Sequence, residues 1–223
     1  MSTLVIVAHP DDEVLGCGGY ILKKSKEEKI HLLIMSDGES SRDYAKDLIL
    51  KNKIKNRKMA AEKAAKILGI KKIFFSKFRD NQMDTEPFLK LVKRIEYIIS
   101  ITKPKTILTH YYGDLNIDHQ LVSKATITAT RPTTECSVKK ILMFSIPSST
   151  EWNFADNKFK PNWYEDITNF SDSKIKALKC YNKELRKKPH PRSLDGIENL
   201  DALNGHKVGV KKAETFVLLR YFD

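Results

Sequence analysis

The stretch LVIVAHPDDEVLGCGG, residues 4–19, decides the fold of this chain. Its first four residues are an unbroken apolar run with β-branched side chains, which predicts a strand buried on both faces. The run ends at His9, and Pro10 fixes its own φ and favours an extended residue before it. The glycine-rich segment that follows, at 14–22, predicts a helix that packs closely against the sheet.

Three consecutive acids, Asp11, Asp12 and Glu13, stand directly after His9 and Pro10. Like charges at a strand end repel one another, so a bound cation would stabilise them, and imidazole and carboxylate groups both bind divalent metals. The alternative is a helix N-terminus, with one aspartate as the cap and Glu13 complementing the helix dipole. Because that alternative gives His9 no role, the stretch favours a metal or catalytic site.

Length and composition indicate one globular domain over residues 1–223, with 41% hydrophobic and 30% charged residues. No apolar run is long enough to span a bilayer, so we expect no membrane insertion. The first residues lead straight into a strand and show no signal-peptide pattern. Cys17, Cys136 and Cys180 are an odd and scattered set, which predicts a reducing, cytoplasmic location without disulfides.

The formal net charge of +12 is compatible with either a nucleic acid or an anionic substrate as the partner. The lysines, however, are spread over several predicted helices, and no basic run contains the interleaved aromatic residues that stack on bases. This distribution is typical of a solvated helix surface. We therefore expect a small-molecule substrate and no specific nucleic-acid partner.

Apolar runs that end in polar loops alternate with amphipathic segments along the first two thirds of the chain. Further strands are predicted at 30–36, 72–75, 106–109 and 141–146, and helices at 44–68, 86–101 and 120–130. This alternation predicts an α/β fold with a mainly parallel sheet and helices on both faces. Ligands bind such sheets beyond the carboxyl ends of the strands, so the acid- and histidine-rich loops should share one edge.

The sequence changes character after Ile146. Residues 147–163 predict irregular structure or an antiparallel hairpin, and a helix is expected from Ser171 or Ser173 to Tyr181. Ser193 is a candidate helix cap, and 213–222 predicts a closing strand. We expect residues 147–223 to complete the substrate pocket of the same domain.

A second candidate group of site residues follows the strand at 106–109, where His110 and His119 flank Asp114, Asn116 and Asp118. With His9 and Asp12, one of these histidines would complete a three-ligand zinc site that keeps a position open for water. Such a site suits hydrolysis, and a neighbouring carboxylate that is not a ligand, Asp11, is a candidate general base. The alternative role for either histidine is structural, and the choice between them stays open on this evidence.

The two motifs AHPDDEVLGCGG (8–19) and GDLNIDHQ (113–120) resemble the LmbE-like superfamily, which includes N-acetylglucosaminyl-phosphatidylinositol de-N-acetylase (PIG-L). The resemblance extends over essentially the whole chain. It implies a Rossmann-like sheet with zinc at its carboxyl edge, and removal of an N-acetyl group from a GlcNAc-like sugar of a small glycoconjugate or nucleotide sugar. It also implies a homo-oligomer, a trimer or hexamer. Two histidines and a carboxylate suit Fe²⁺ as well as Zn²⁺.

Carried over position by position, the resemblance assigns roles to six residues. It implies zinc ligation by His9, Asp12 and His119, general-base catalysis by Asp11, and substrate binding by Arg57 and Asp80.

One position departs from the pattern of the superfamily. Many members have histidine where this chain has Asn116, and asparagine can donate a hydrogen bond to an oxyanion but cannot act as an acid near neutral pH. His190, in the stiff Pro-His-Pro-Arg-Ser loop, is therefore a candidate catalytic acid, with a structural loop histidine as the alternative. Arg192 beside it is a candidate ligand for a substrate phosphate or carboxylate.

The leading hypothesis is a zinc-dependent N-deacetylase. One alternative is an enzyme that hydrolyses another amide or acyl group in secondary metabolism. Another is a non-catalytic sugar-binding protein with the same fold, against which the intact set of His9, Asp11, Asp12 and His119 argues.

Overall fold

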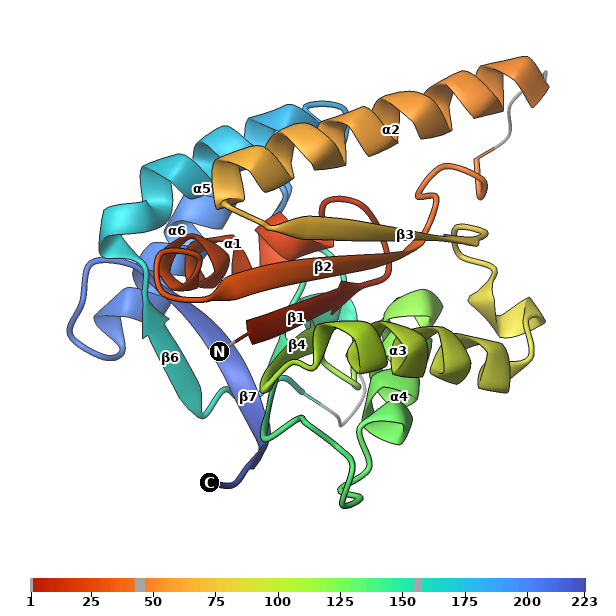
Figure 1. Cartoon of the computed structure of the whole chain (residues 1–223). Helices are drawn as coiled ribbons and strands as arrows, with labels where there is room; N and C mark the ends of the chain where they lie inside the picture. The colour runs from red at the N-terminus through yellow and green to blue at the C-terminus, as the bar shows by residue number, and fades with distance from the viewer. Residues whose placement is uncertain (1, 43–46, 155–157) are drawn as a thin grey trace.

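The computed structural model describes residues 2–42, 47–154 and 158–223. Its sheet has seven strands in the order β3-β2-β1-β4-β5-β7-β6 (Figure 1). The strands are β1 (Ser2–Val7), β2 (Lys29–Ser36), β3 (Lys72–Phe78), β4 (Thr106–His110), β5 (Lys140–Phe144), β6 (Trp163–Asp166) and β7 (Ala213–Tyr221). Neighbours from β3 to β5 pair in parallel, whereas β7 is antiparallel to both β5 and β6.

Helices cover both faces of this sheet. They are α1 (Asp12–Lys24), α2 (Asp47–Leu68), α3 (Phe88–Thr102), α4 (Ile117–Ala129), α5 (Ser171–Leu178) and α6 (Leu194–His206), with short 3₁₀ turns η1 (Met83–Thr85), η2 (Thr150–Trp152), η3 (Thr168–Phe170) and η4 (Lys179–Tyr181). Helices α3 and α4 lie together on one face, and α1, α2, α5 and α6 lie on the other (Figure 1). The predicted α/β architecture is confirmed.

Strand β1 is apolar at every position from Leu4 to Val7, with no alternation of polar and apolar residues, because both of its faces are buried. Leu4 and Ile6 belong to the core under α3 and α4, whereas Val5 and Val7 belong to the core under α1 and α2. All four side chains are fully buried. A strand with helices on both sides has no face for polar residues.

Helix α1 packs closely on the sheet, as its glycines predict. A side chain at Gly16 would overlap the ring of Phe144 on β5. The sequence did not predict a break in this helix at Cys17, where φ is −154°. After the break the amides of Gly19 and Tyr20 donate to the carboxylate of Glu214 at 2.8 and 2.7 Å, so β7 caps the second half of α1.

The start of α4 differs from its prediction, whereas the end of α2 agrees with its prediction. Helix α4 begins at Ile117, not at Gln120, because the Asn116 side chain accepts hydrogen bonds from the amides of Asp118 and His119 and caps the helix. Helix α2 is described from Asp47, and its predicted start at 44–46 lies outside the described residues. Its predicted end is confirmed, with φ of +74° at Gly69.

The C-terminal third was predicted least well. Of the two alternatives for 147–163, irregular structure is the one found: the described residues there form irregular backbone, η2 and the first residue of β6, and β6 pairs with the distant β7. The expected strand at 213–222 is confirmed as β7. Ser193 caps α6, because its Oγ accepts a hydrogen bond from the Gly196 amide at 3.0 Å.

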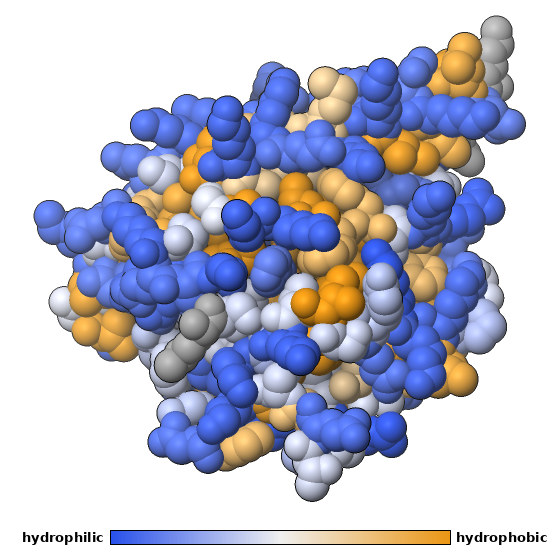
Figure 2. All heavy atoms as spheres, in the orientation of Figure 1, coloured by the Kyte–Doolittle hydropathy of each residue, from blue (hydrophilic) through white to orange (hydrophobic). Residues whose placement is uncertain are grey.

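The surface is largely hydrophilic. Figure 2 shows hydrophilic side chains spread over the visible face, including along α2, with smaller hydrophobic areas between them. Among the described residues, no helix has the length and apolar character needed to cross a membrane.

Candidate metal and active site

The loops after β1, β2, β3 and β4 meet at the carboxyl edge of the sheet, as predicted, and enclose a cavity of about 180 Å³. Residues from α2 and from the segment after η4 complete its wall. Eight of the nine predicted site residues line this cavity: His9, Asp11, Asp12, Arg57, Asp80, Asn116, His119 and Arg192.

Three buried side chains form a compact group at the base of the cavity. The Nδ1 of His9 lies 3.1 Å from Nε2 of His119 and 3.3 Å from Oδ2 of Asp12. The same Asp12 oxygen lies 3.4 Å from Nε2 of His119. Two imidazoles and a carboxylate that converge in this way are a suitable ligand set for one divalent metal.

The outer ring nitrogens of both histidines face carboxylates. The Nε2 of His9 lies 3.1 Å from Asp80 and 3.2 Å from Asp118, and Nδ1 of His119 lies 3.1 Å from Asp114. Such carboxylates hold a ligating imidazole in one tautomer and one orientation. Asp114 and Asp118, which sequence reasoning left without a role, are therefore part of the site, and their spacing around His119 was the available signal.

Electrostatics at this group favour positive charge. Burial lowers the pKa of His9, but hydrogen bonds with Asp118, Asp12 and Asp80 outweigh burial and raise that pKa well above its ordinary value. Oδ1 of Asp12 is buried and has no hydrogen-bond partner among the described residues. A divalent cation bound here would neutralise the acids and give this oxygen a partner, so the residues fit a metal.

A second group, His9, Asp80 and Asp118, also has ligand-like spacing. However, the carboxylate of Asp118 already accepts hydrogen bonds from the amides of Asn81 and Met83 at 2.8 and 3.1 Å. These bonds hold the loop after β3. Asp118 is not among the residues that line the cavity, whereas His9, Asp12 and His119 all line it, so the first group is the better metal candidate.

The geometry of His110 favours a supporting role over metal ligation. Its Nε2 accepts a hydrogen bond from the Ala8 amide at 2.9 Å, and its ring stacks on His119 with centroids 4.0 Å apart. Since the nitrogen that faces Asp12 is already an acceptor, its lone pair is not free for a metal. The sequence alone had left this choice open.

Asp11 is buried between two arginines. Its Oδ2 lies 3.5 Å from Nη1 of Arg192 and 3.9 Å from Nη2 of Arg57, and within residues 2–42, 47–154 and 158–223 it makes no hydrogen bond. Burial raises the pKa of this carboxyl, and the charges of Arg57 and Arg192 oppose the rise without cancelling it. A carboxylate with a raised pKa and a free lone pair is well suited to accept a proton.

The backbone of Asp11 is held in an unusual conformation, with φ of +144°. Its amide donates to Oε2 of Glu13 at 3.1 Å, and Oε1 of Glu13 accepts from the Tyr181 hydroxyl at 2.6 Å. Burial raises the pKa of Glu13 to about 8. The third acid of the motif therefore supports Asp11, a role that was not predicted.

Arg57 enters the cavity from α2 and is fixed by Glu184, with which it forms a close ion pair. Glu184 also accepts a hydrogen bond from Arg42 at 2.9 Å. Gly38, with φ of +70°, lies in the loop after β2 and packs closely against both Pro10 and Arg57. A side chain at this position would overlap the ring of Pro10. Glu184 had no sequence signal, since it is an isolated acid in an irregular segment.

Many members of the superfamily have a histidine at the position of Asn116. Asn116 was the candidate to stabilise the oxyanion in its place, and His190 was the candidate catalytic acid. Oδ1 of Asn116 caps α4, and its Nδ2 donates to Asn81 at 2.7 Å, which leaves a second N–H for the cavity. His190 is the predicted residue that does not line the cavity: it is half-buried, packs edge-on against Trp152, and accepts a hydrogen bond from the Arg192 amide. Its role as an acid stays a prediction.

Solved structures with the same architecture define the class. N,N'-diacetylchitobiose deacetylase from Pyrococcus horikoshii matches with 22% identity and a TM-score of 0.77, over 98% of this chain and 84% of that one. A zinc-inhibited form of teicoplanin deacetylase matches over 100% of both chains, with 14% identity and a TM-score of 0.75. The 4-carboxy-2-hydroxymuconate hydratase GalB from Pseudomonas putida matches over 100% and 97%, with 22% identity and a TM-score of 0.77. The fold is thus that of the LmbE-like proteins.

The family model for GlcNAc-PI de-N-acetylase (PIG-L) matches residues 4–130, which is more than half of the chain and includes both motifs. The protein belongs to this family of deacetylases.

Proposed function

We propose that this protein is a metal-dependent hydrolase that removes the N-acetyl group from a GlcNAc-like sugar of a small glycoconjugate or nucleotide sugar. The observation that carries the proposal is the buried group of His9, Asp12 and His119 in one cavity with Asp11, whose Oδ2 has no hydrogen-bond partner in the part of the chain that the structure describes. The family match and the two deacetylases among the similar structures support it.

A bound divalent metal supplies Lewis-acid stabilisation of the acetyl oxygen and lowers the pKa of a water molecule. The residues of the chain supply the proton transfers. Asp11 accepts the proton of the attacking water and, once protonated, returns it to the leaving nitrogen. The second N–H of Asn116 stabilises the developing oxyanion. The C–N bond breaks, and acetate and the free amino sugar are the products.

Zinc is our first choice for the metal, and Fe²⁺ suits the same ligands. The zinc-inhibited teicoplanin deacetylase shows that zinc inhibits that protein, so the metal here must be identified by analysis of the purified chain. The cytoplasmic location and the trimer or hexamer stay predictions from the sequence and its resemblance.

Incubation of the purified, metal-loaded chain with a panel of neutral and phosphorylated N-acetyl sugars tests the proposal. We expect release of acetate together with a new primary amine. The hydratase among the similar structures makes a useful comparison, because hydration of a double bond releases no acetate. A chain that binds metal fully and releases no acetate from any member of the panel would contradict the proposal.

A further inference from the structure

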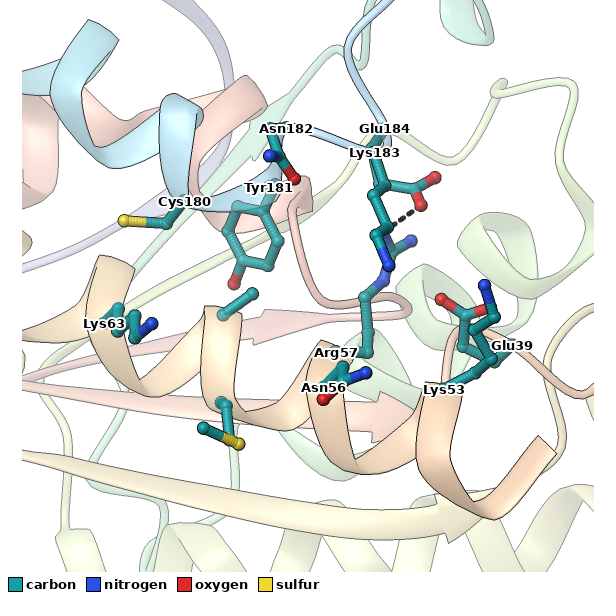
Figure 3. A pocket seen from close by; sticks show the side chains of 12 residues that line it. Glu39, Lys53, Asn56, Arg57, Lys63, Cys180, Tyr181, Asn182, Lys183 and Glu184 are labelled. Carbon is teal, nitrogen blue, oxygen red and sulfur yellow. Dashed lines mark ion pairs between the residues drawn. The ribbon is translucent and has the colours of Figure 1, made fainter. Parts of the chain in front are cut away.

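A second cavity, of about 210 Å³, adjoins the cavity that holds the metal candidates. It lies between α2 and the segment of η4 and the residues after it, as Figure 3 shows. Arg57 and Glu184 line both cavities, so this ion pair forms their common wall. A substrate that reaches across this wall would place its two ends in different chemical surroundings.

The second cavity is rich in cations. Four basic side chains line it against two carboxylates: Lys53, Arg57, Lys63 and Lys183 against Glu39 and Glu184. Both carboxylates already have partners. Arg42 donates to Glu39 at 2.8 Å and to Glu184 at 2.9 Å, and Arg57 pairs with Glu184 as well. The charge that remains in the cavity is therefore positive.

Lys63 and Lys183 carry most of this remaining charge. Lys63 comes from α2 and Lys183 from the residues after η4, so the two walls each supply one ammonium group (Figure 3). In the part of the chain that the structure describes, neither forms an ion pair. The amides of Asn56 and Asn182 add hydrogen-bond donors from the same two walls.

The plainer account is that these lysines belong to the general solvated surface of a basic protein. Three features separate this pair from lysines that lie outside the cavity. The pair lines a concave site, the lining includes the apolar side chains of Met59 and Ala60, and one wall is the ion pair that also borders Asp11. Cationic groups around a partly apolar depression attract an anion more strongly than the same groups on an open surface.

We propose that this cavity is a phosphate subsite, and that the substrate is an N-acetylated amino sugar that carries a phosphoryl group. The inference rests on the proposed function, because the acetamide must occupy the metal cavity. A phosphoryl group presents several acceptor oxygens and close to two negative charges, which matches ammonium and amide donors from two walls. A neutral sugar would leave Lys63 and Lys183 without partners.

The experiment compares kcat/KM for GlcNAc with kcat/KM for its 1-phosphate and its 6-phosphate, using the full metal-loaded chain. The test variant is Lys63→Gln/Lys183→Gln. The matched control is Lys66→Gln/Lys179→Gln, which makes the same charge change on α2 and on η4, at residues that do not line the cavity. We expect wild type to prefer a phosphorylated sugar. The test variant should lose about tenfold or more of kcat/KM for that sugar, the scale of charge-assisted hydrogen bonds, and little for GlcNAc.

Equal kcat/KM for neutral and phosphorylated sugars in wild type, or equal losses in test and control variants, would overturn the subsite and leave the deacetylase proposal intact. If no sugar is deacetylated, the proposed function fails, and the subsite is then tested by calorimetric binding of the sugar phosphates. The subsite is supported if the sugar phosphates bind wild type more tightly than GlcNAc does and only the test variant weakens that binding. It is overturned if the test and control variants bind the sugar phosphates equally well.

Discussion

Asp11 is the residue on which the proposed chemistry depends. It lies between the metal candidates and two arginines, and its amide donates a hydrogen bond to Glu13. Its Oδ2 is buried and has no hydrogen-bond partner among the residues described by the structure. The arginines favour the ionised carboxylate, whereas burial favours the protonated form. A base needs both forms to be accessible during one turnover.

The change Asp11→Asn tests this role. The amide keeps the shape of the side chain but cannot accept the proton of water, so turnover should fall by about 10²-fold or more. Metal content should stay near that of wild type, because Asp11 is outside the group His9, Asp12 and His119. Acetate release at equal metal occupancy is the measurement, and near-normal turnover would remove Asp11 from the role.

The assignment of the third metal ligand is tested by two histidine variants. His119→Ala should lose both metal and activity, because two protein ligands rarely retain zinc against solvent. His110→Asn should retain much of the metal, since His110 Nε2 is occupied by the Ala8 amide. Metal analysis of the two purified variants decides, and the reverse pattern would make His110 the ligand.

Residues within the two motifs could be predicted from the sequence because each motif directly follows a parallel strand. The ends of these two strands, β1 and β4, lie at the same edge of the sheet. Glu184 and Tyr181 could not be predicted in this way. They reach the site through the packing of η4 and the residues after it against α2, and nothing in their own segment marks them. His190 is a conspicuous loop histidine that is not among the residues lining the cavity, and its role as an acid stays a prediction.

At the scale of elements, the loop 189–193 contributes Arg192 in place of His190. Arg192 donates from Nε to the Pro147 carbonyl at 3.1 Å and lies beside Asp11. We therefore expect His190→Gln to keep the metal and to lower turnover by less than about tenfold, well below the loss expected for a general acid or base. A pH–rate profile that loses its basic limb in this variant would restore His190 as the acid.

Helix α1 depends on a buried polar cluster for its second half. The ammonium of Lys174 lies 2.8 Å from Asp201 and 2.9 Å from Glu214, and Glu214 also holds the amides of Gly19 and Tyr20. Burial lowers the pKa of Lys174, but the charges of Asp201 and Glu214 outweigh it and raise that pKa. The cluster joins α1, α5, α6 and β7.

The change Lys174→Gln should therefore reduce the free energy of unfolding by about 3 kcal/mol or more, because it leaves the buried carboxylates of Asp201 and Glu214 without their cation. Chemical denaturation measures this loss. The control Glu27→Gln breaks an exposed pair with Lys24, which is 3.3 Å long, and should change stability by about 0.5 kcal/mol or less. Equal effects of the two changes would contradict the role of the cluster.

At the scale of the whole molecule, the order of elements from β1 to β5 could be predicted because each of the strands β1 to β4 is a short apolar run followed by a helix. Strand β6 was missed because it has four residues and pairs only with β7, about 50 positions later. The break at Cys17 was missed because the backbone amides after it donate to Glu214, which lies near the far end of the chain. Non-local contacts of this kind leave no local pattern.

The measurement that tests the central claim most directly is acetate release by one preparation of the chain in three states: as purified, after removal of metal with a chelator, and after reloading with Zn²⁺ or Fe²⁺. The substrate is the best N-acetyl sugar of the panel, and acetate and primary amine are both quantified. We predict that they form one to one, that release stops without metal, and that reloading with one of these ions restores it. Undiminished release from the metal-free chain, or no release at full metal occupancy, would contradict the account.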